Sequence, residues 1–465
     1  MSSYTDNRGL LNHLYCVDYK VAQIRPRQPQ RGTSQWIFGD PTYVSWLNSG
    51  RPSMLMLTGP PGTGKTVLTR CLLENILSGG GEQQSSSGYL AINFFCSYFE
   101  SAISSEGAVL RSLLHQLIQL NPYCGQIIRN RLEKQTNFGI VTSLEVSDLR
   151  HALLEALSMH TMKSVFIVID AIEELGIEVA ISTLTGLFQV AQDLSKTYPE
   201  SRLKVFVSSR HNPAYLSAIP NLKVLTIKNP QMQRDIKAYL EAVIEDFATE
   251  NSDFEGVASS STRLNIIAQI TRISNGMFLF AVLAWEDFRK GILWNQHEVD
   301  QKLEKLVSIR PGMTTFYDKM INSINESTRE DAFSIFSILA SAATPLTGTE
   351  IGIILGICRS TGVIMRSTDF QPFQNLNDNI ERNFADLITI QNDDRLTFVH
   401  MSFKEYLQNR DDFQAILHSG HRNITRSCLK YLRLKDLLQD ACDGRSRDGM
   451  LPTHLANLIG VNETY

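Results

Sequence analysis

The sequence predicts an α/β fold in which a parallel sheet is flanked by helices, followed by a helical domain and a winged-helix domain. Three observations predict it. Before residue 229, apolar runs alternate with helical patterns, as in parallel sheets covered on both faces. From Asn229 onward, apolar residues repeat at helical spacing. A single hairpin pattern then appears among helices, between Phe384 and His400, with Asn392-Asp393-Asp394 as its turn.

Five short apolar runs are the predicted strands. Two of them read VFIVI and KVFV, and such continuous apolar runs are typical of strands buried on both faces. The strands are expected over Met54–Thr58, Tyr89–Cys96, Ser164–Ile169, Leu203–Ser208 and Lys223–Ile227. Helical spacing predicts helices over Thr66–Leu77, Ser105–Leu120 and Val146–Ser158. The polar, glycine-rich stretch Ser78–Gly88 is expected to be a surface loop.

Composition places the chain among ordinary globular proteins. It has 465 residues, of which 43% are hydrophobic and 20% charged. Lys and Arg total 44 against 48 Asp and Glu, a formal charge of −4, which predicts no broad basic surface for nucleic acid. Between Asp331 and Arg410, nine acidic residues outnumber six basic ones. We therefore expect the winged helix not to bind DNA.

Cysteine usage and hydropathy predict a cytoplasmic protein without a transmembrane segment. The seven cysteines form no CxxC pair, which favours reduced thiols over a zinc site or a disulfide framework. The N-terminus has no apolar core of signal-peptide length. The most apolar stretch, Gly276–Trp285, is shorter than the roughly 20 residues that span a bilayer.

One motif predicts a phosphate-binding loop and hence a P-loop NTPase sheet. The sequence GPPGTGKT fits G-x-x-x-x-G-K-[ST], and an apolar strand precedes it while a helical pattern follows. Such a match arises by accident in roughly one or two chains per hundred of this length. Its glycines let backbone amides point at an anion, its lysine reaches the terminal phosphates, and its threonine hydroxyl holds Mg²⁺. The predicted cofactor-binding residues here are Gly59, Pro60, Pro61, Gly62, Thr63, Gly64, Lys65, Thr66 and Val67.

Acidic and basic residues follow two other predicted strands. Asp170 ends the strand VFIVID, and with Thr66 it is the predicted metal-shell residue. Glu173 and Glu174 follow, and a carboxylate there suits the orientation or deprotonation of the attacking water. The alternative is a solvated helix start, where acids favour the dipole. Arg210 ends the strand VFVSSR and is a candidate to stabilise phosphate charge, against the alternative of a surface arginine.

Six segments in a fixed order resemble a known family. They read GTSQW…WL, GPPGTGKT, VFIVIDAIEEL, VFVSSR, SNGMFLFA and FVHMSFKEYL. This order is similar to the NACHT group of STAND nucleotide-triphosphatases, in particular the fungal NLR-like branch related to the nephrocystin-like N-terminal domain. The resemblance runs from about Leu14 to Arg433. The phosphate loop alone is shared by many ATPases, whereas the joint order is more specific.

The resemblance implies roles for individual residues. The family pattern D-G/A-h-D-E holds magnesium and activates water, and Glu173 replaces its usual Asp. Because geometry errors of about 1 Å can cost on the order of a hundredfold in rate, slow ATP hydrolysis is less firmly implied than binding. Ser208, Ser209 and Arg210 correspond to the family's T-S-R, with Ser208 in place of Thr. By resemblance His400 contacts the β-phosphate of ADP, whereas the residues alone favour a satisfied core histidine.

Base contacts are not assigned by the sequence. Phe278 stands where many relatives carry a proline that contacts adenine. Trp36, Phe38 and Trp46 in the lead-in are candidates to flank the base, and core positions are the favoured alternative.

The implied organisation has five parts: a lead-in (1–50), a NACHT nucleotide-binding domain (51–228), a helical domain (229–325), a winged-helix domain (326–410) and a helical segment (411–465). The implied function is an ATP/ADP- and Mg²⁺-binding switch of fungal innate immunity or heterokaryon incompatibility, which self-associates or co-assembles with related STAND proteins. The alternative is a nucleotide-binding scaffold without useful hydrolysis, and a cycling AAA-type motor is disfavoured by His400. The chain resembles the switch core alone, because only about 58 residues precede the loop.

Overall fold

The computed structural model describes residues 7–15, 29–30, 32–78, 89–96, 105–133, 145–159, 164–210, 213–220, 222–290, 295–308, 313–322, 324–360, 363–373, 375–384, 387–391 and 394–434. The chain forms two compact units. The first holds the residues up to 312 except 99–101, and the second holds the remainder. Most of the predicted Ser78–Gly88 loop lies outside the described residues.

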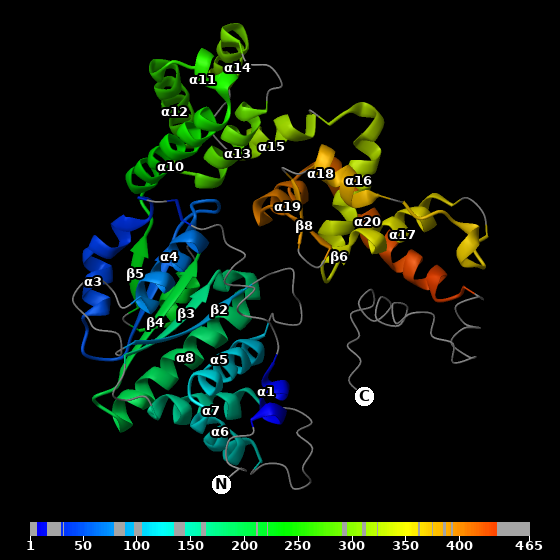
Figure 1. Ribbon diagram of the computed structural model, residues 1–465. Coiled ribbons are helices and arrows are strands. Elements are labelled where there is room, and N and C mark those ends of the chain that lie inside the picture. The colour runs from blue at the N-terminus through cyan, green and yellow to red at the C-terminus, as the bar shows by residue number, and fades with distance from the viewer. Residues whose placement is uncertain are drawn as a thin grey trace. The chain divides into compact units, whose positions relative to one another are not determined.

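A five-stranded parallel sheet is the centre of the first unit (Figure 1). Its strands run in the order β2-β3-β4-β1-β5. They are β1 (Ser53–Thr58), β2 (Tyr89–Phe95), β3 (Ser164–Asp170), β4 (Arg202–Ser209) and β5 (Lys223–Thr226). The predicted parallel α/β fold is confirmed, and each predicted strand matches an observed one to within one residue at either end. The order places β4 between β1 and β3.

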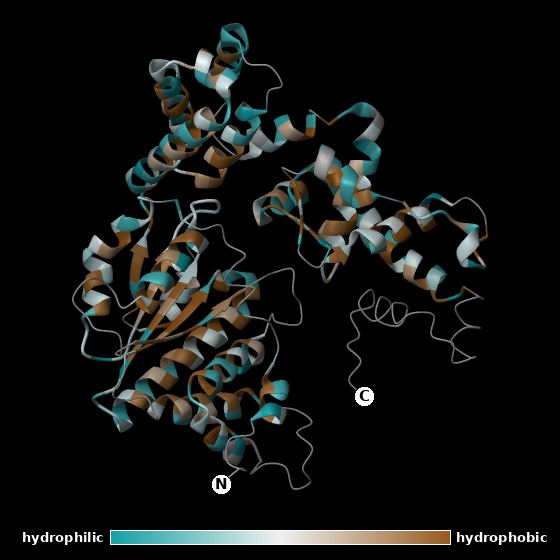
Figure 2. Ribbon diagram, viewed as in Figure 1, coloured by the Kyte–Doolittle hydropathy of each residue, from teal (hydrophilic) through white to brown (hydrophobic). Residues whose placement is uncertain are grey.

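Helices cover both faces of this sheet, and Figure 2 shows its strands as the most apolar layer. One face packs against α5 (Glu106–Leu120), α6 (Tyr123–Glu133), α7 (Val146–Ser158) and α8 (Ile177–Thr197). The other face packs against η1 (Gln35–Gly39), α3 (Pro41–Leu47) and α4 (Lys65–Leu77). Short helices α1 (Arg8–Leu14) and α9 (Pro213–Ala218) complete the first face. Burial on both faces explains the continuous apolar runs of the strands.

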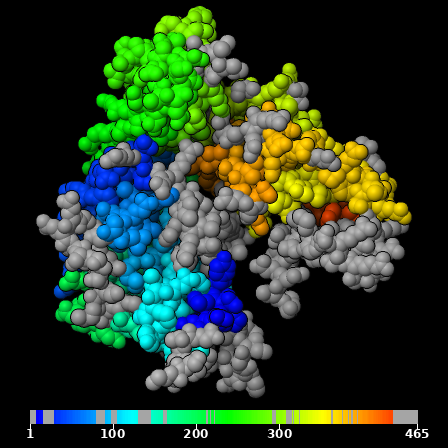
Figure 3. Space-filling view, in the orientation of Figure 1, coloured from blue at the N-terminus to red at the C-terminus, as the bar shows by residue number. Residues whose placement is uncertain are grey.

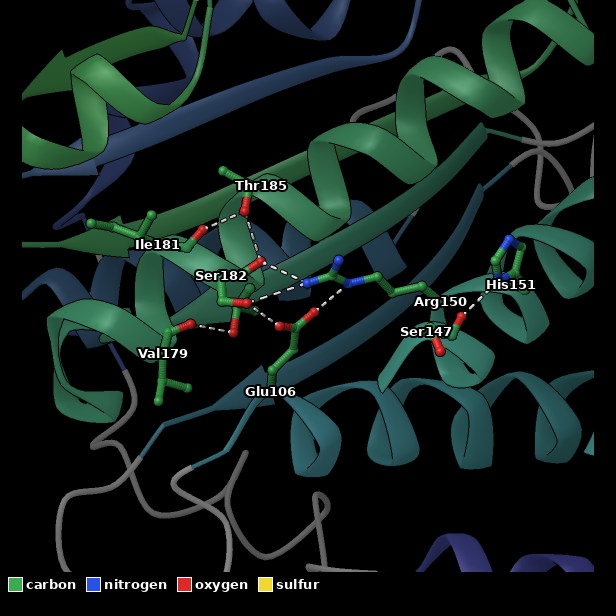
Figure 4. Close-up of polar contacts among 9 residues, drawn as sticks. Glu106, Ser147, Arg150, His151, Val179, Ile181, Ser182 and Thr185 are labelled. Carbon is green, nitrogen blue, oxygen red and sulfur yellow. Dashed lines mark hydrogen bonds and ion pairs between the residues drawn. The ribbon is translucent and has the colours of Figure 1, made fainter. Parts of the chain in front are cut away.

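A buried polar network fastens three helices of the first face together (Figure 4). Arg150 Nε of α7 donates to Glu106 Oε1 of α5 at 2.6 Å. The Ser182 hydroxyl of α8 donates to Glu106 Oε2 at 2.6 Å, so both carboxylate oxygens are satisfied. A Cβ on Gly186 would lie 2.5 Å from Arg150 Nε, so a larger residue there would displace the Arg150 side chain from this network.

Helices follow the sheet, as predicted from Asn229 onward. They are α10 (Asn229–Glu250), α11 (Ser252–Val257), α12 (Ser260–Ser274), α13 (Phe278–Arg289) and α14 (Gln296–Ser308). Aromatic side chains form the contact between α10, α11 and α13: the ring of Phe247 lies 5.1 Å from that of Phe254 and 5.6 Å from that of Trp285.

The second unit is helical around a small antiparallel sheet. The predicted hairpin is confirmed as β7 (Ile388–Ile390) paired with β8 (Arg395–Phe398), although Asn392 and Asp393 of its turn lie outside the described residues. A third strand, β6 (Leu346–Thr347), pairs with β8. That the second unit contains a winged-helix domain stays a prediction. The helices are α15 (Met313–Asn322), α16 (Glu326–Ser341), α17 (Gly348–Arg359), η4 (Ser367–Asp369), α18 (Leu376–Asn383), α19 (Met401–Gln408) and α20 (Asp411–Tyr431).

Two further observations concern the hydropathy of the helices and the state of the cysteines. Across the residues that the structure describes, the helices are too short or too polar to cross a membrane. The cysteines among them are free thiols: Cys71, Cys96, Cys124, Cys358 and Cys428.

Candidate functional site

The site is built where three strands end side by side. Because β1, β4 and β3 are parallel neighbours, their carboxyl ends meet at one edge of the sheet. The loop Gly59–Gly64 follows β1, Asp170 ends β3, Ser209 ends β4 and Arg210 comes directly after it. The topology therefore gathers three predicted site segments that are more than 100 residues apart at their extremes.

The loop after β1 has the backbone of an anion cradle. Gly62 and Gly64 have φ of +73° and +81°, in the left-handed region that favours glycine. Gly64 is the N-cap of α4 and offers no side chain to its first amides. A Cβ on Gly59 would lie 3.0 Å from Thr63 Oγ1 and 3.1 Å from Ile227 Cδ1. The positive-φ glycines and the start of α4, which has no side-chain cap, fit a bound phosphate group.

Lys65 places a buried cation at this loop. Its Nζ donates to the carbonyl oxygens of Gly59 at 2.9 Å and Pro60 at 3.1 Å. Burial lowers the pKa of Lys65, while the carboxylates of Glu173 and Asp170 act in the opposite direction. Both acids therefore lie close enough to act on the ammonium group.

Asp170 is held by two hydroxyl groups. Its Oδ1 accepts from Thr69 Oγ1 of α4 at 2.8 Å and from Ser208 Oγ of β4 at 2.5 Å. Thr69 was not predicted; its position three residues after Thr66 puts both threonines on one side of α4. Thr66 itself is half-buried in the first turn. One carboxylate oxygen is thus fixed by α4 and β4, which orients the group.

Ala171 turns the chain sharply after Asp170. Its φ of +53° is left-handed, which is uncommon outside glycine, and its amide donates to Ser208 Oγ at 2.9 Å. The short 3₁₀-helix η3 (Ile172–Leu175) follows. This conformation favours a small residue at position 171.

Glu173 combines burial with an ion pair. Its Oε1 lies 3.5 Å from Arg210 Nε. Its Oε2 is buried and accepts no hydrogen bond from the described residues. Burial raises the pKa of Glu173, and the charge of Lys65 opposes that effect. A desolvated carboxylate of this kind suits proton abstraction from water. Glu174 is half-buried and acts more weakly on Lys65.

The segment around Phe278 contacts the loop directly. The backbone amide of Leu279 donates to the Gly62 carbonyl oxygen at 3.0 Å. A Cβ on Gly64 would lie 3.9 Å from Phe278 Cβ, and the Phe278 ring packs 5.2 Å from that of Tyr239. The N-terminus of α13 therefore supports the loop, a role that no spacing in the sequence indicated.

The lead-in aromatics belong to the core around the sheet. Trp46 is fully buried, with its ring 6.0 Å from Phe166, and Trp36 and Phe38 pack against the same cluster. Trp36 Nε1 donates to Asp235 Oδ2 of α10 at 3.1 Å. The favoured core interpretation of these residues is confirmed.

His400 belongs to the second unit, so its predicted phosphate contact stays a prediction. It caps α19, because its Nδ1 accepts from the backbone amide of Ser402 at 3.1 Å. The Ser402 hydroxyl lies 2.8 Å from both Nδ1 and the Tyr317 hydroxyl. With Nδ1 as an acceptor, a neutral imidazole carries its proton on Nε2.

Comparison with known proteins gives one family match. The profile of the family described as nephrocystin 3, N-terminal, matches residues 32–210, which include β1 to β4 and the site. The chain is thus similar to that family over this region, and the narrower fungal NACHT assignment stays a prediction. A search of curated proteins found no match.

Solved structures show distant likenesses. The ORC2 protein of Aeropyrum pernix is 12% identical with a TM-score of 0.39, over 85% of this chain and 97% of that one. A Signal Transduction ATPase with Numerous Domains (STAND) protein with a tetratricopeptide repeat sensor, from Pyrococcus horikoshii, is 13% identical with a TM-score of 0.37, over 88% of this chain and 50% of that one.

Proposed function

We propose that this protein is an ATP/ADP-binding switch of the STAND type. The observation that carries the proposal is the joint placement of the glycine loop, Lys65, Asp170 and Glu173 at one edge of the parallel sheet. A glycine turn without a ligand would have no reason to carry a buried cation. A lysine with a purely structural role would have no reason to lie beside two carboxylates. The combination is the chemistry of a polyphosphate site with a divalent cation.

The residues of the loop would hold the nucleotide. The amides at the start of α4 and the Lys65 ammonium would bind phosphate oxygens, and Thr66 with Asp170 would hold Mg²⁺. The metal ion supplies neutralisation of phosphate charge when bound. Thr69 and Ser208 keep Asp170 oriented, so their hydrogen bonds position the metal shell from outside.

Slow hydrolysis follows from Glu173 and Arg210. Glu173 would accept a proton from the attacking water, and Arg210 would stabilise charge on the transferred phosphoryl group. In this structure the two side chains face one another at 3.5 Å. Arg210 would therefore have to leave Glu173 before its guanidinium group could contact the phosphates.

Switching would use the second unit. His400 would contact the β-phosphate of ADP through its Nε2 proton, and ATP would release that contact and favour self-association or co-assembly with related STAND proteins. Such a change from 1:99 to 99:1 needs about 5.5 kcal/mol of differential binding. In the organism, such a switch would act in fungal innate immunity or heterokaryon incompatibility.

Calorimetry with the full chain tests nucleotide binding. Wild type is titrated with ATP and ADP in Mg²⁺, and any nucleotide that co-purifies is identified after denaturation. Lys65→Ala should lose binding. Lys196→Ala is the matched control, because Lys196 is an exposed lysine of α8 whose side chain is 70% accessible. No heat and no extracted nucleotide with wild type would contradict the proposal.

A second function, a nucleotide-binding scaffold without useful hydrolysis, is favoured by the engagement of Glu173 with Arg210. Steady-state ATPase rates for wild type and Glu173→Gln separate the two functions. Equal rates support the scaffold, and a loss in the variant supports the hydrolytic switch.

A further inference from the structure

One side of α20 is a row of cations. Arg422, Arg426 and Lys430 are spaced by four residues, which places them along one side of the helix, and Arg433 follows two residues after the end of α20 at Tyr431. The two arginines at 422 and 426 are exposed, and none of the four has an ion pair or a hydrogen bond from its side chain among the described residues. No Asp or Glu occurs from residue 413 to residue 434.

The opposite side of α20 explains why this row faces outward. A Cβ on Gly420 would lie 2.5 Å from the carbonyl oxygen of Ser337, so α20 packs tightly against α16 there. Phe413 and Ser427 are buried on the same side. The packed side of α20 is therefore already used within the second unit, and the cations lie away from it.

Exposed apolar residues lie beside the cations. Leu429 is 56% exposed and Leu432 is 39% exposed. A hollow of about 560 Å³ runs along this side of the helix. Its described lining is the four cations together with His421, Thr425 and Leu429. An exposed helix side that offers both charge and leucine side chains is typical of a protein-binding surface.

The first unit carries a surface of opposite charge on α10 and α11, which are green in Figure 3. From residue 238 to residue 262 the chain has six acidic residues and no Lys or Arg. They are all exposed: Glu241, Glu245, Asp246, Glu250, Asp253 and Glu255. Glu241 and Glu245 pair with Lys237 and Arg263, at 3.7 Å and 2.9 Å. The remaining four have no ion pair among the described residues.

We propose that the basic side of α20 in one copy of the chain docks on the acidic surface of α10 and α11 in a second copy. The two surfaces are different parts of the chain, so the contact is head-to-tail and each copy offers one of each kind. Complementary potentials steer such an encounter and set its register, and the two leucines add apolar contact. The inference rests on the self-association in the proposed function and names its surfaces.

Charge-swap variants of the full chain test the contact. Arg422→Glu/Arg426→Glu reverses two charges of the basic side, and Asp246→Lys/Glu250→Lys reverses two of the acidic surface at the same i,i+4 spacing. Sedimentation velocity with ATP and Mg²⁺ should show at least roughly tenfold weaker self-association for each variant alone. An equimolar mixture should regain assembly, because each reversed surface then meets its complement in the other variant.

Controls keep a loss of folding apart from a loss of contact. Lys196→Glu/Arg202→Glu also reverses two exposed cations and should assemble as wild type does. Recovery in the mixture itself shows that both variants are folded. Nucleotide titration of each variant should match wild type, since the phosphate loop is unchanged.

Several results would overturn the inference. They are wild-type assembly by either variant, no recovery in the mixture, and a monomeric wild type that nevertheless binds nucleotide. The last result would leave nucleotide binding standing. Binding of wild type to duplex DNA or to phosphatidylserine vesicles that Arg422→Glu/Arg426→Glu abolishes, with unchanged self-association, would assign the basic side to another partner.

Discussion

Two buried lysines lie at opposite ends of the parallel sheet. Lys204 is at the amino end of β4, where it pairs in register with Ser53, and Lys65 follows the carboxyl end of β1. Both are at most 9% exposed. Burial lowers the pKa of both, to about 8 for Lys204. Their surroundings differ, and that difference separates a structural lysine from a candidate functional one.

Lys204 hydrogen-bonds the turn that leads into β1. Its Nζ donates to the carbonyl and hydroxyl oxygens of Ser49, to the carbonyl oxygen of Arg51 at 3.2 Å and to the Ser53 hydroxyl at 3.1 Å. The charges acting on it are the cations of Lys223 and Arg202. A satisfied lysine of this kind stabilises the connection into β1 and has no acidic group to share with a ligand.

Lys65 makes fewer hydrogen bonds than Lys204, and negative charges act on its ammonium group. Its two acceptors are carbonyl oxygens of the glycine loop, and the carboxylates of Glu173 and Asp170 act on it. A phosphate oxygen is a better partner for the ammonium than a neutral carbonyl oxygen. Burial of a lysine is therefore no indication of function by itself, whereas the carboxylates and the glycine cradle are.

The largest expected effect is on nucleotide affinity. Lys65→Ala should weaken ATP binding at least on the order of a hundredfold, because a buried charge-assisted contact to phosphate is lost. Lys204→Ala should leave affinity within about threefold, since its surroundings lie at the other end of the sheet. Calorimetric titration of both variants measures this. Equal losses in the two variants would contradict a specific role of Lys65 in nucleotide binding.

Glu173→Gln should lower ATP turnover by roughly ten- to a hundredfold while raising stability. The pKa of Glu173 is raised in the folded protein, so its ionised form costs folding free energy above the unfolded pKa. The gain of the variant should therefore be present at pH 7 and vanish as pH falls below about 4.5. Steady-state ATPase rates and urea unfolding against pH check both parts. A variant less stable than wild type at pH 7 would contradict the burial argument.

Gly64→Ala should destabilise the protein by about 1–2 kcal/mol, because an L-residue pays that amount at φ of +81°. It should also weaken nucleotide binding through the altered loop. Gly50→Ala is the matched control, since a Cβ there meets no atom within 4 Å and its φ is not positive. Chemical unfolding of both variants gives the difference, and equal costs would count against the strained loop.

The smallest effect concerns Lys204. Its folded pKa of about 8 is below the ordinary value of 10.5, so the unfolded chain binds more protons between these pH values. The free energy of unfolding should therefore rise between pH 8 and pH 10.5, by on the order of 1 kcal/mol. Lys204→Met should lack this rise. The difference in unfolding free energy between wild type and variant at pH 8 and pH 10 measures it. A flat difference would show that the pKa is not lowered.

Local patterns were read from the sequence with little error. The strands ended where the apolar runs ended, and the loop motif placed Lys65 and the positive-φ glycines correctly. Asp170 and Arg210 are candidates from the sequence because each closes an apolar run, and the strand order brings the ends of both runs to one edge of the sheet. Long-range partners were missed: Thr69 on Asp170, Asp235 on Trp36 and Leu279 on the loop. A hydrogen bond between residues 100 or more apart leaves no periodic signal in a chain.

The net charge of a sequence likewise does not show where its charged residues lie on the surface. The net charge of −4 hides a basic row on α20 and an acidic surface on α10 and α11, because their contributions cancel in the sum. The sequence contains both runs, and only the helix packing shows which side of each helix faces outward.

The amino-acid sequence alone determined the parallel strands, the helical second half and the phosphate-loop motif, because these depend on local periodicity and on glycine at fixed offsets. The tertiary structure decided which strand lies between β1 and β3, and with it which carboxylates act on Lys65. Strand order is set by the packing of the whole sheet against its helices, and no short window of sequence contains that information.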